Sequence, residues 1–210
     1  MRTSLAAFLA LALVTPSLSA QDLERPDGWQ VRFDNPGASE ADLEMFVEMP
    51  PGWHVTTGPA GIFWSPGHTA SGDFRAEMEV FLFDPQGRRE AFGLFVGGSD
   101  LQADDQEYTY FLLRDGGQFI IKRREGSEAP TVRPWTSHEA IVGYADRGDA
   151  ATAKNVLAIE ANGDTVRFLV NGAEVASLPR SEVPVDGLYG FRVNHALNLH
   201  VSRLDVTPLQ

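Results

Sequence analysis

The sequence predicts an all-β fold, a two-sheet antiparallel β-sandwich of the jelly-roll type. Apolar and polar residues alternate in short runs, most clearly over residues 155–206, and a period of two is that of a strand with one buried face. Twenty glycines and 13 prolines separate these runs. No periodic amphipathic helix occurs between residues 21 and 210, where the helix-compatible segments are few and short. We expect residues 21–210 to form a single domain, because sandwiches of this length are commonly one unit.

The chain begins with a segment typical of a secretory signal peptide. Arg2 precedes an apolar run over residues 5–14, and small residues follow up to Ala20. The apolar run is too short for a permanent membrane anchor. We therefore expect residues 1–20 to be removed near Ala20, which leaves a protein that is secreted or periplasmic. The sequence has no cysteine, so disulfides and a lipid-modified cysteine are excluded.

The first half of the chain is a series of strand-like runs. The segment over residues 65–73, SPGHTASGD, is rich in turn residues and predicts a loop. After it, alternation over residues 74–83 places Phe74, Met78 and Val80 on one face, with Arg75 and Glu77 on the other. We expect strands at residues 28–33, 45–49, 52–55, 62–64, 74–83, 91–96 and 108–113.

The second half contains the clearest hairpins. Asn162-Gly163 and Asn171-Gly172 each supply the positive φ angles of a tight turn. They predict a meander of strands at residues 155–161, 165–171 and 174–178. A strand at 118–123 and a long irregular connection over 125–149 precede the meander, and strands at 187–193 and 198–206 follow it. We expect roughly ten to twelve strands in all, which suits a jelly roll.

Three segments resemble a known fold family. They are SGDFRAEMEV (71–80), FGLFVG (92–97) followed by YTYFLLR (108–114), and the C-terminal meander. Their order is similar to that in the concanavalin A-like lectin/glucanase superfamily, which includes laminin-G-like domains, and within it is most similar to the 3-keto-disaccharide hydrolase-like family. In that family the strand matching residues 108–114 typically carries an acid as a functional candidate, where this chain has Thr109. The resemblance thus implies a jelly roll. The replacement of the acid by Thr109 weakens the expectation that the chain shares the family's hydrolase activity.

The acidic composition excludes one class of partner. The net charge is −12 at pH 7, whereas binding to a phosphate backbone requires clustered Lys and Arg. We therefore expect no nucleic-acid partner. The single basic cluster, Lys122-Arg123-Arg124, is interpreted as a solvated strand end or hairpin tip.

Catalytic residues are hard to assign. A glycosidase needs two facing carboxylates, and Glu77 with Glu79, two apart on one strand, is the nearest approach to such a pair. Arg75 shares their face, which is more typical of an ion-paired sheet surface. No G-x-S-x-G sequence or H-E-x-x-H spacing occurs. We expect no catalysis; if the protein is an enzyme, a glycoside hydrolase-like activity is the expected one.

One loop has the composition of a calcium site. Asp100, Asp104 and Asp105 crowd the connection between two strands, and Ca²⁺ prefers several oxygen ligands of this kind. The alternative is a solvated acidic loop, and the sequence leaves both open. Ca²⁺ is the one cofactor that we consider.

Ligand recognition is the remaining kind of site. Sugars stack their apolar faces on aromatic rings, and polar side chains bond the hydroxyl groups. The candidate contacts are Tyr108, Tyr110, Trp135, Arg192 and Asn194. Tyr108 and Tyr110 lie on one face of a strand, where they form either a binding platform or part of the core.

These observations lead to a functional hypothesis with two alternatives. We expect an exported, non-catalytic recognition module whose partner is a glycan or another extracellular polymer. The first alternative is a hydrolase of the 3-keto-disaccharide hydrolase-like type. The second is a structural or protein-interaction domain, which should expose an apolar patch or an unprotected sheet edge.

Overall fold

The computed structural model describes residues 24–209, and the predicted signal peptide lies outside this part of the chain. Within it the structure has fourteen strands and three short 3₁₀ helices. The strands are β1 (Gln30–Phe33), β2 (Leu43–Glu48), β3 (Trp53–Thr57), β4 (Gly61–Ala70), β5 (Phe74–Leu82), β6 (Ala91–Ser99), β7 (Glu107–Arg114), β8 (Gln118–Glu125), β9 (Thr131–Ser137), β10 (Ala153–Asn162), β11 (Thr165–Val170), β12 (Ala173–Pro179), β13 (Gly187–Val193) and β14 (Asn198–Pro208). The 3₁₀ helices are η1 (Glu40–Asp42), η2 (Tyr144–Asp146) and η3 (Arg180–Glu182).

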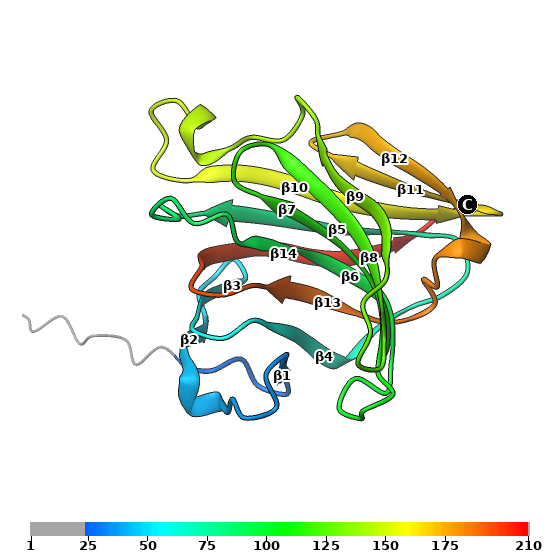
Figure 1. Cartoon of the computed structure of the whole chain (residues 1–210), viewed down its shortest axis with the longest axis horizontal. Coiled ribbons are helices and arrows are strands. Elements are labelled where there is room, and N and C mark those ends of the chain that lie inside the picture. The colour runs from blue at the N-terminus through cyan, green and yellow to red at the C-terminus, as the bar shows by residue number, and fades with distance from the viewer. Residues whose placement is uncertain (1–23, 210) are drawn as a thin grey trace, which may run out of the picture.

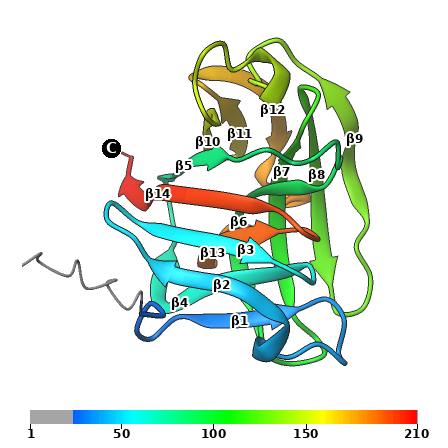
Figure 2. The ribbon, with the colours of Figure 1, turned by 90° about the vertical axis from the view of Figure 1, so that its left-hand side faces the viewer.

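The strands form two antiparallel sheets of seven strands each (Figure 1). Sheet A has the order β1-β4-β13-β6-β7-β8-β9, and sheet B has the order β12-β11-β10-β5-β14-β3-β2. Figure 2 shows β14, β3 and β2 side by side at the end of sheet B. Because the chain passes repeatedly between the sheets, neighbouring strands are often distant in sequence. The all-β sandwich predicted from the sequence is confirmed.

The core lies between the sheets and follows from the alternation of apolar residues. In β5, buried and partly exposed residues alternate along the whole strand, with Phe74, Met78 and Val80 buried. Sheet A contributes Phe111 and Phe191 to the same core. Removing these side chains from water contributes roughly 1.5–3 kcal/mol each. The alternation therefore determines which face of each sheet is buried in this core and which face is left on the outside, where a ligand could bind.

The C-terminal meander forms as β10, β11 and β12, and its two turns differ. Asn171 and Gly172 both have positive φ, 51° and 85°, as a type I′ turn requires. At the first turn Asn162 pairs with Thr165 inside the ladder, and only Gly163, at 53°, has positive φ. That pattern fits a type II′ turn, so the first turn begins one residue later than the Asn-Gly pair suggests.

Two segments differ from the sequence-based expectation. The predicted loop at residues 65–73 is wrong for its first six residues, because β4 continues to Ala70. Pairing with β13 on both sides of an irregularity at Leu188/Gly190 holds this segment extended. The connection at 125–149 contains β9, which pairs with β8 at the edge of sheet A. An edge strand tolerates Pro134, whose missing N–H would disrupt a central strand. β9 is thus the added strand, and residues 24–209 have fourteen strands where roughly ten to twelve were expected.

None of the helices in residues 24–209 is both long and apolar enough to cross a membrane.

Candidate functional site

The outer face of sheet A, turned away from sheet B, carries a second apolar cluster. It is built by the residues that alternate with the core residues on β4, β6, β7 and β8. Tyr108 and Tyr110 are 2% and 6% exposed there, and their rings lie 5.5 Å apart. The cluster comprises Ile62, Trp64, Ala91, Phe95, Leu101, Tyr108, Tyr110, Leu112 and Ile120, with Trp135 and Leu188 packed against it.

An ion pair between a buried arginine and an exposed aspartate lies on this cluster. Arg192, on β13, is 7% exposed, and its guanidinium donates to both carboxylate oxygens of Asp34, with Nη1 2.9 Å from Oδ1. Nη1 also donates to the hydroxyl of Tyr108 at 3.2 Å. The guanidinium carbon is 5.4 Å from the ring centre of Tyr110, within cation–π range. Arg192 thus links the residue after β1 to the centre of sheet A.

The environment determines the charge of each of these groups. Burial alone would lower the pKa of Arg192, but the hydrogen bonds to Asp34 raise it above its ordinary value. Burial alone would raise the pKa of Asp34, but hydrogen bonding and charge from Arg192 lower it. Burial raises the pKa of Tyr108 and raises that of Tyr110 to about 12. At neutral pH the pair is therefore charged and both phenols are neutral.

A hollow of about 300 Å³ opens beside this ion pair. Trp135, half-buried on β9, forms one wall. The guanidinium of Arg114 covers the Trp135 ring at 3.9 Å from its centre, and Gln118 fixes Arg114 by accepting a hydrogen bond from its Nε at 3.0 Å. The hollow is lined by Asp34, Ala91, Tyr110, Leu112, Ile120, Lys122, Arg124, Ala129, Trp135, Arg192 and Asn194.

A second hollow of about 830 Å³ adjoins the first. It lies among β1, the segment after it and the loops that flank β7 and β8, and it shares Asp34 and Arg124 with the smaller hollow. Its lining is polar, with Asn35, Gln102 and Gln106 among its residues.

The structure brings together the residues predicted to bind a ligand. Tyr110, Trp135, Arg192 and Asn194 all line the smaller hollow, and Tyr108 lies under it through its contact with Arg192. The two tyrosines belong neither to the core between the sheets nor to an open platform, because neighbouring side chains bury them on the outer face. Trp135 and the edge of Tyr110 are the aromatic surfaces available. Their role in binding stays a prediction.

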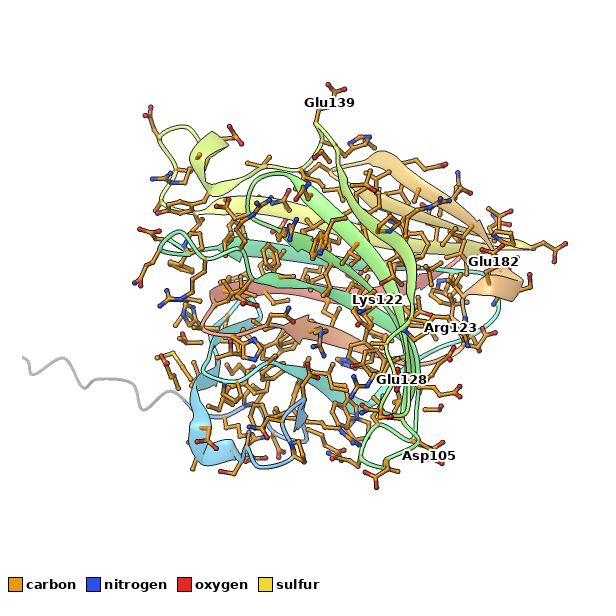
Figure 3. All side chains as sticks on the ribbon, in the orientation of Figure 1. Asp105, Lys122, Arg123, Glu128, Glu139 and Glu182 are labelled. Carbon is orange, nitrogen blue, oxygen red and sulfur yellow. The ribbon has the colours of Figure 1, made fainter. Side chains whose placement is uncertain are left out.

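Three polar residues of the hollow are absent from the sequence-based set. Asp34 follows the first strand and is 158 residues from Arg192, so no local pattern connects them. Lys122 and Arg124 alternate with Arg123 along β8, and Figure 3 labels Lys122 and Arg123. Both Lys122 and Arg124 lie near the end of β8 and are partly exposed, as expected, and they also line the hollow. Their spacing, together with buried Ile120, could have indicated a shared face.

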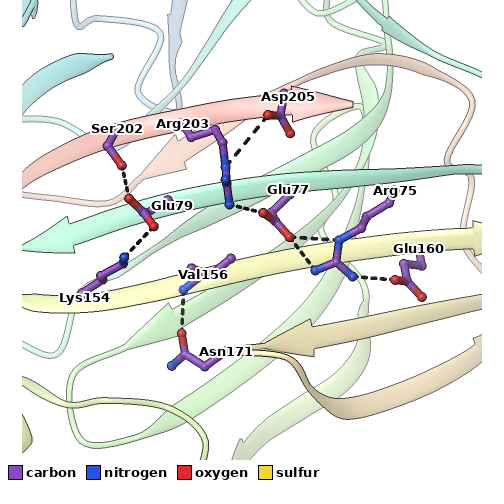
Figure 4. Close-up of polar contacts among 10 residues, drawn as sticks. All are labelled: Arg75, Glu77, Glu79, Lys154, Val156, Glu160, Asn171, Ser202, Arg203 and Asp205. Atoms are coloured by element: carbon purple, nitrogen blue, oxygen red, sulfur yellow. Dashed lines mark hydrogen bonds and ion pairs between the residues drawn. The ribbon is translucent and has the colours of Figure 1, made fainter. Parts of the chain in front are cut away.

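Glu77 and Glu79 lie on the outer face of sheet B, in a network of ion pairs (Figure 4). One carboxylate oxygen of Glu77 accepts from Arg75 at 2.5 and 2.9 Å, and the other accepts from Arg203. Glu79 lies 2.7 Å from Lys154 and accepts from Ser202 at 2.8 Å. This is the ion-paired surface that Arg75 indicated, and neither carboxylate lines the hollows of sheet A.

The acidic loop does not assemble a set of cation ligands. Residues 24–209 contain no group of three His, Cys, Asp or Glu side chains that could hold a metal ion. Tight turns separate the carboxylates: Asp100 has φ 50°, and its carbonyl accepts from Ala103 N–H at 2.7 Å. Asp100, Asp104 and Asp105 are all exposed, and the nearest cation to Asp104 is Arg32 at 3.9 Å. Figure 3 shows Asp105 at the outer edge of the molecule.

Comparisons with known proteins identify the fold. No protein-family model and no curated protein matches the chain. The carbohydrate binding module CBM66 from Bacillus subtilis superposes with a TM-score of 0.60 at 17% identity, covering 85% of this chain and 94% of that one. A GH16 from the mixed linkage glucan PUL of Bacteroides ovatus, in complex with a G4G4G3G product, gives 0.61 at 9% identity, with 89% and 97% covered. The exoplasmic/lumenal domain of VIP36 in a Ca²⁺/Man-bound form gives 0.60 at 8% identity, with 87% and 84% covered. The chain therefore has a jelly-roll sandwich fold like that of these three structures.

Proposed function

We propose that the protein binds a carbohydrate chain on the outer face of sheet A, with the smaller hollow as the principal subsite. The observation that carries this is the meeting of Trp135, Tyr110, Arg192 and Asn194 around one cavity. A sugar ring offers an apolar face to the aromatic walls and hydroxyl groups to the polar side chains. The adjoining hollow would take further units of the chain.

Recognition without hydrolysis agrees best with the charges in the hollow. Asp34 is the one carboxylate in the lining of the smaller hollow, and both of its oxygens accept hydrogen bonds from Arg192. A glycosidase needs an acid that is protonated near its working pH and a second carboxylate facing it. The lowered pKa of Asp34 is opposite to what the general acid requires, and the smaller hollow has no second carboxylate in its lining to take that role.

The fold supports the same class of function. One similar structure carries the name of a carbohydrate binding module, and another is a mannose-bound form. Because folds of this kind carry several activities, the hydrolase alternative is kept as an outcome of the test. We propose further that the chain is exported after cleavage near Ala20 and acts as one domain.

Calorimetric titration of the mature protein with neutral and acidic oligosaccharides tests the proposal. Trp135→Ala should lower the affinity for the tightest-binding ligand by at least about tenfold, because a buried aromatic contact dominates such interfaces. The matched control is Phe81→Ala, which truncates a half-buried aromatic residue on the outer face of sheet B.

Equal affinities of wild type and Trp135→Ala, or no saccharide binding at all, would contradict the proposal. The same incubations are analysed for released sugars. Turnover by the wild type would overturn the non-catalytic part of the proposal and leave the location of the site standing.

A further inference from the structure

The smaller hollow is cationic in a protein that is strongly acidic. Its lining contains Lys122, Arg124 and Arg192 against a single acid, Asp34, whereas the chain as a whole carries a charge of −12. Asp34 neutralises Arg192 through two hydrogen bonds. No ion pair or hydrogen bond joins the side chain of Lys122 or Arg124 to another residue within 24–209. Two positive charges in the hollow are thus unmatched.

Most other bases in residues 24–209 have a side-chain partner. Arg88, Arg89, Arg114 and Arg147 bond only to uncharged oxygens, and the exposed Arg133 is the one further base without a partner. On the outer face of sheet B, Arg75, Lys154, Arg167 and Arg203 all lie within 2.9 Å of a carboxylate. Arg123, between the two unmatched bases on β8, lies 2.9 Å from Glu125. Lys122 and Arg124 differ from Arg133 in lining one cavity together, and two unpaired cations at one cavity indicate a ligand that brings its own negative charge.

We propose that the saccharide is acidic and that its anionic group binds between Lys122 and Arg124. This inference rests on the proposed function. The guanidinium of Arg124 offers planar paired donors that suit a carboxylate or a sulfate ester, and Lys122 adds a point charge. Trp135 stacks on the ring that bears the group. Asp34 repels the anion from the part of the hollow nearest Arg192 and directs it towards β8.

A nucleic acid fits these observations less well. Its backbone requires neutralisation of many phosphates along its length, and the hollow offers two unmatched cations in about 300 Å³. The negative charge of the rest of the protein would repel a long polyanion of high charge density. An acidic sugar unit requires only a local match.

The test compares each ligand with its neutral form. Tetrasaccharides of galacturonate, mannuronate and hyaluronan are titrated beside their methyl esters, and a carrageenan tetrasaccharide is titrated beside its desulfated form. At least one ionised ligand should bind about tenfold or more tightly than its neutral form, and the preference should shrink as salt screens the charges. The arm that shows the preference identifies the carboxylate or the sulfate as the source of charge.

Three variants locate the effect. Lys122→Gln and Arg124→Gln should each weaken binding of the ionised ligand by about five- to tenfold, and by a larger factor than they weaken binding of the neutral form. Arg123→Gln is the matched control, since it removes the same charge from the same strand but points to the other face. The wild-type comparison with neutral ligands decides the question even where a variant fails to fold.

Each outcome has a separate meaning. Equal binding of ionised and neutral ligands by the wild type overturns the inference and leaves the proposed function intact. Equal weakening of both forms by Lys122→Gln and Arg124→Gln overturns the role assigned to their charge. Binding of no ligand in any arm overturns the proposed function and the inference together.

Discussion

The substitution Asp34→Asn tests whether the ion pair between Asp34 and Arg192 stabilises the folded protein. Arg192 is held by Asp34 on one side and Tyr108 on the other, and the Arg192 side chain is 9% exposed. The amide of asparagine keeps one acceptor oxygen and loses the negative charge. The guanidinium then stays buried with part of its hydrogen bonding and without its counter-charge.

The size of the effect follows from the burial of the two partners. Removing one member of a fully buried ion pair costs about 3–5 kcal/mol. The Asp34 side chain is 36% exposed, so water already solvates part of the carboxylate and the interaction is discounted. We expect Asp34→Asn to lower the free energy of unfolding by about 1–3 kcal/mol at pH 7.

The pH dependence of this loss has a definite sign. Since the pKa of Asp34 is lowered in the folded protein, its stabilisation is complete above the ordinary carboxyl pKa of about 3.9. It disappears as the pH falls through the lower folded value. The difference between wild type and Asp34→Asn should therefore shrink below about pH 4.

Urea unfolding at neutral and acidic pH measures both quantities. Asp104→Asn is the matched control, because Asp104 also lies near an arginine but is fully exposed, and we expect no measurable change there. The reasoning is refuted if Asp34→Asn costs no more than Asp104→Asn, or if its cost is unchanged on acidification.

Two further predictions concern a turn and a phenol. Gly172→Val should destabilise the protein by about 1–3 kcal/mol, because a β-branched residue resists the positive φ of this turn; a urea midpoint equal to that of Gly172→Asn would contradict this. In an alkaline titration followed by ultraviolet absorbance, Tyr110→Phe should remove a transition near pH 12. Loss of a transition near pH 10 instead would show that Tyr110 is open to water.

The sequence was most informative where local rules act alone. Alternation over residues 74–83 determined the buried face of β5, and Asn171-Gly172 determined a hairpin turn. Strand β9 was missed because Pro134 and exposed polar residues resemble a loop, and only pairing with β8 makes the segment a strand. Where tertiary pairing decides the structure, local patterns do not suffice.

The site shows the same division. The spacing of Tyr108 and Tyr110 predicted a shared face, and the structure places both there. Their burial was not predictable, because it depends on how neighbouring strands and loops cover the face. Asp34 could not be paired with Arg192 from sequence, since 158 residues separate them and only the position of β1 beside β4 in sheet A brings them together.

The indole N–H signals of the four tryptophans report where on the protein the ligand binds. A Trp135→Phe variant assigns the Trp135 signal. When an oligosaccharide that binds the protein is added in an NMR titration, this signal should shift. The signals of Trp29 and Trp53, which pack against each other 4.6 Å apart beside the core between the sheets, should stay in place. Shifts of Trp29 and Trp53 with an unmoved Trp135 signal would place the ligand elsewhere and contradict the account.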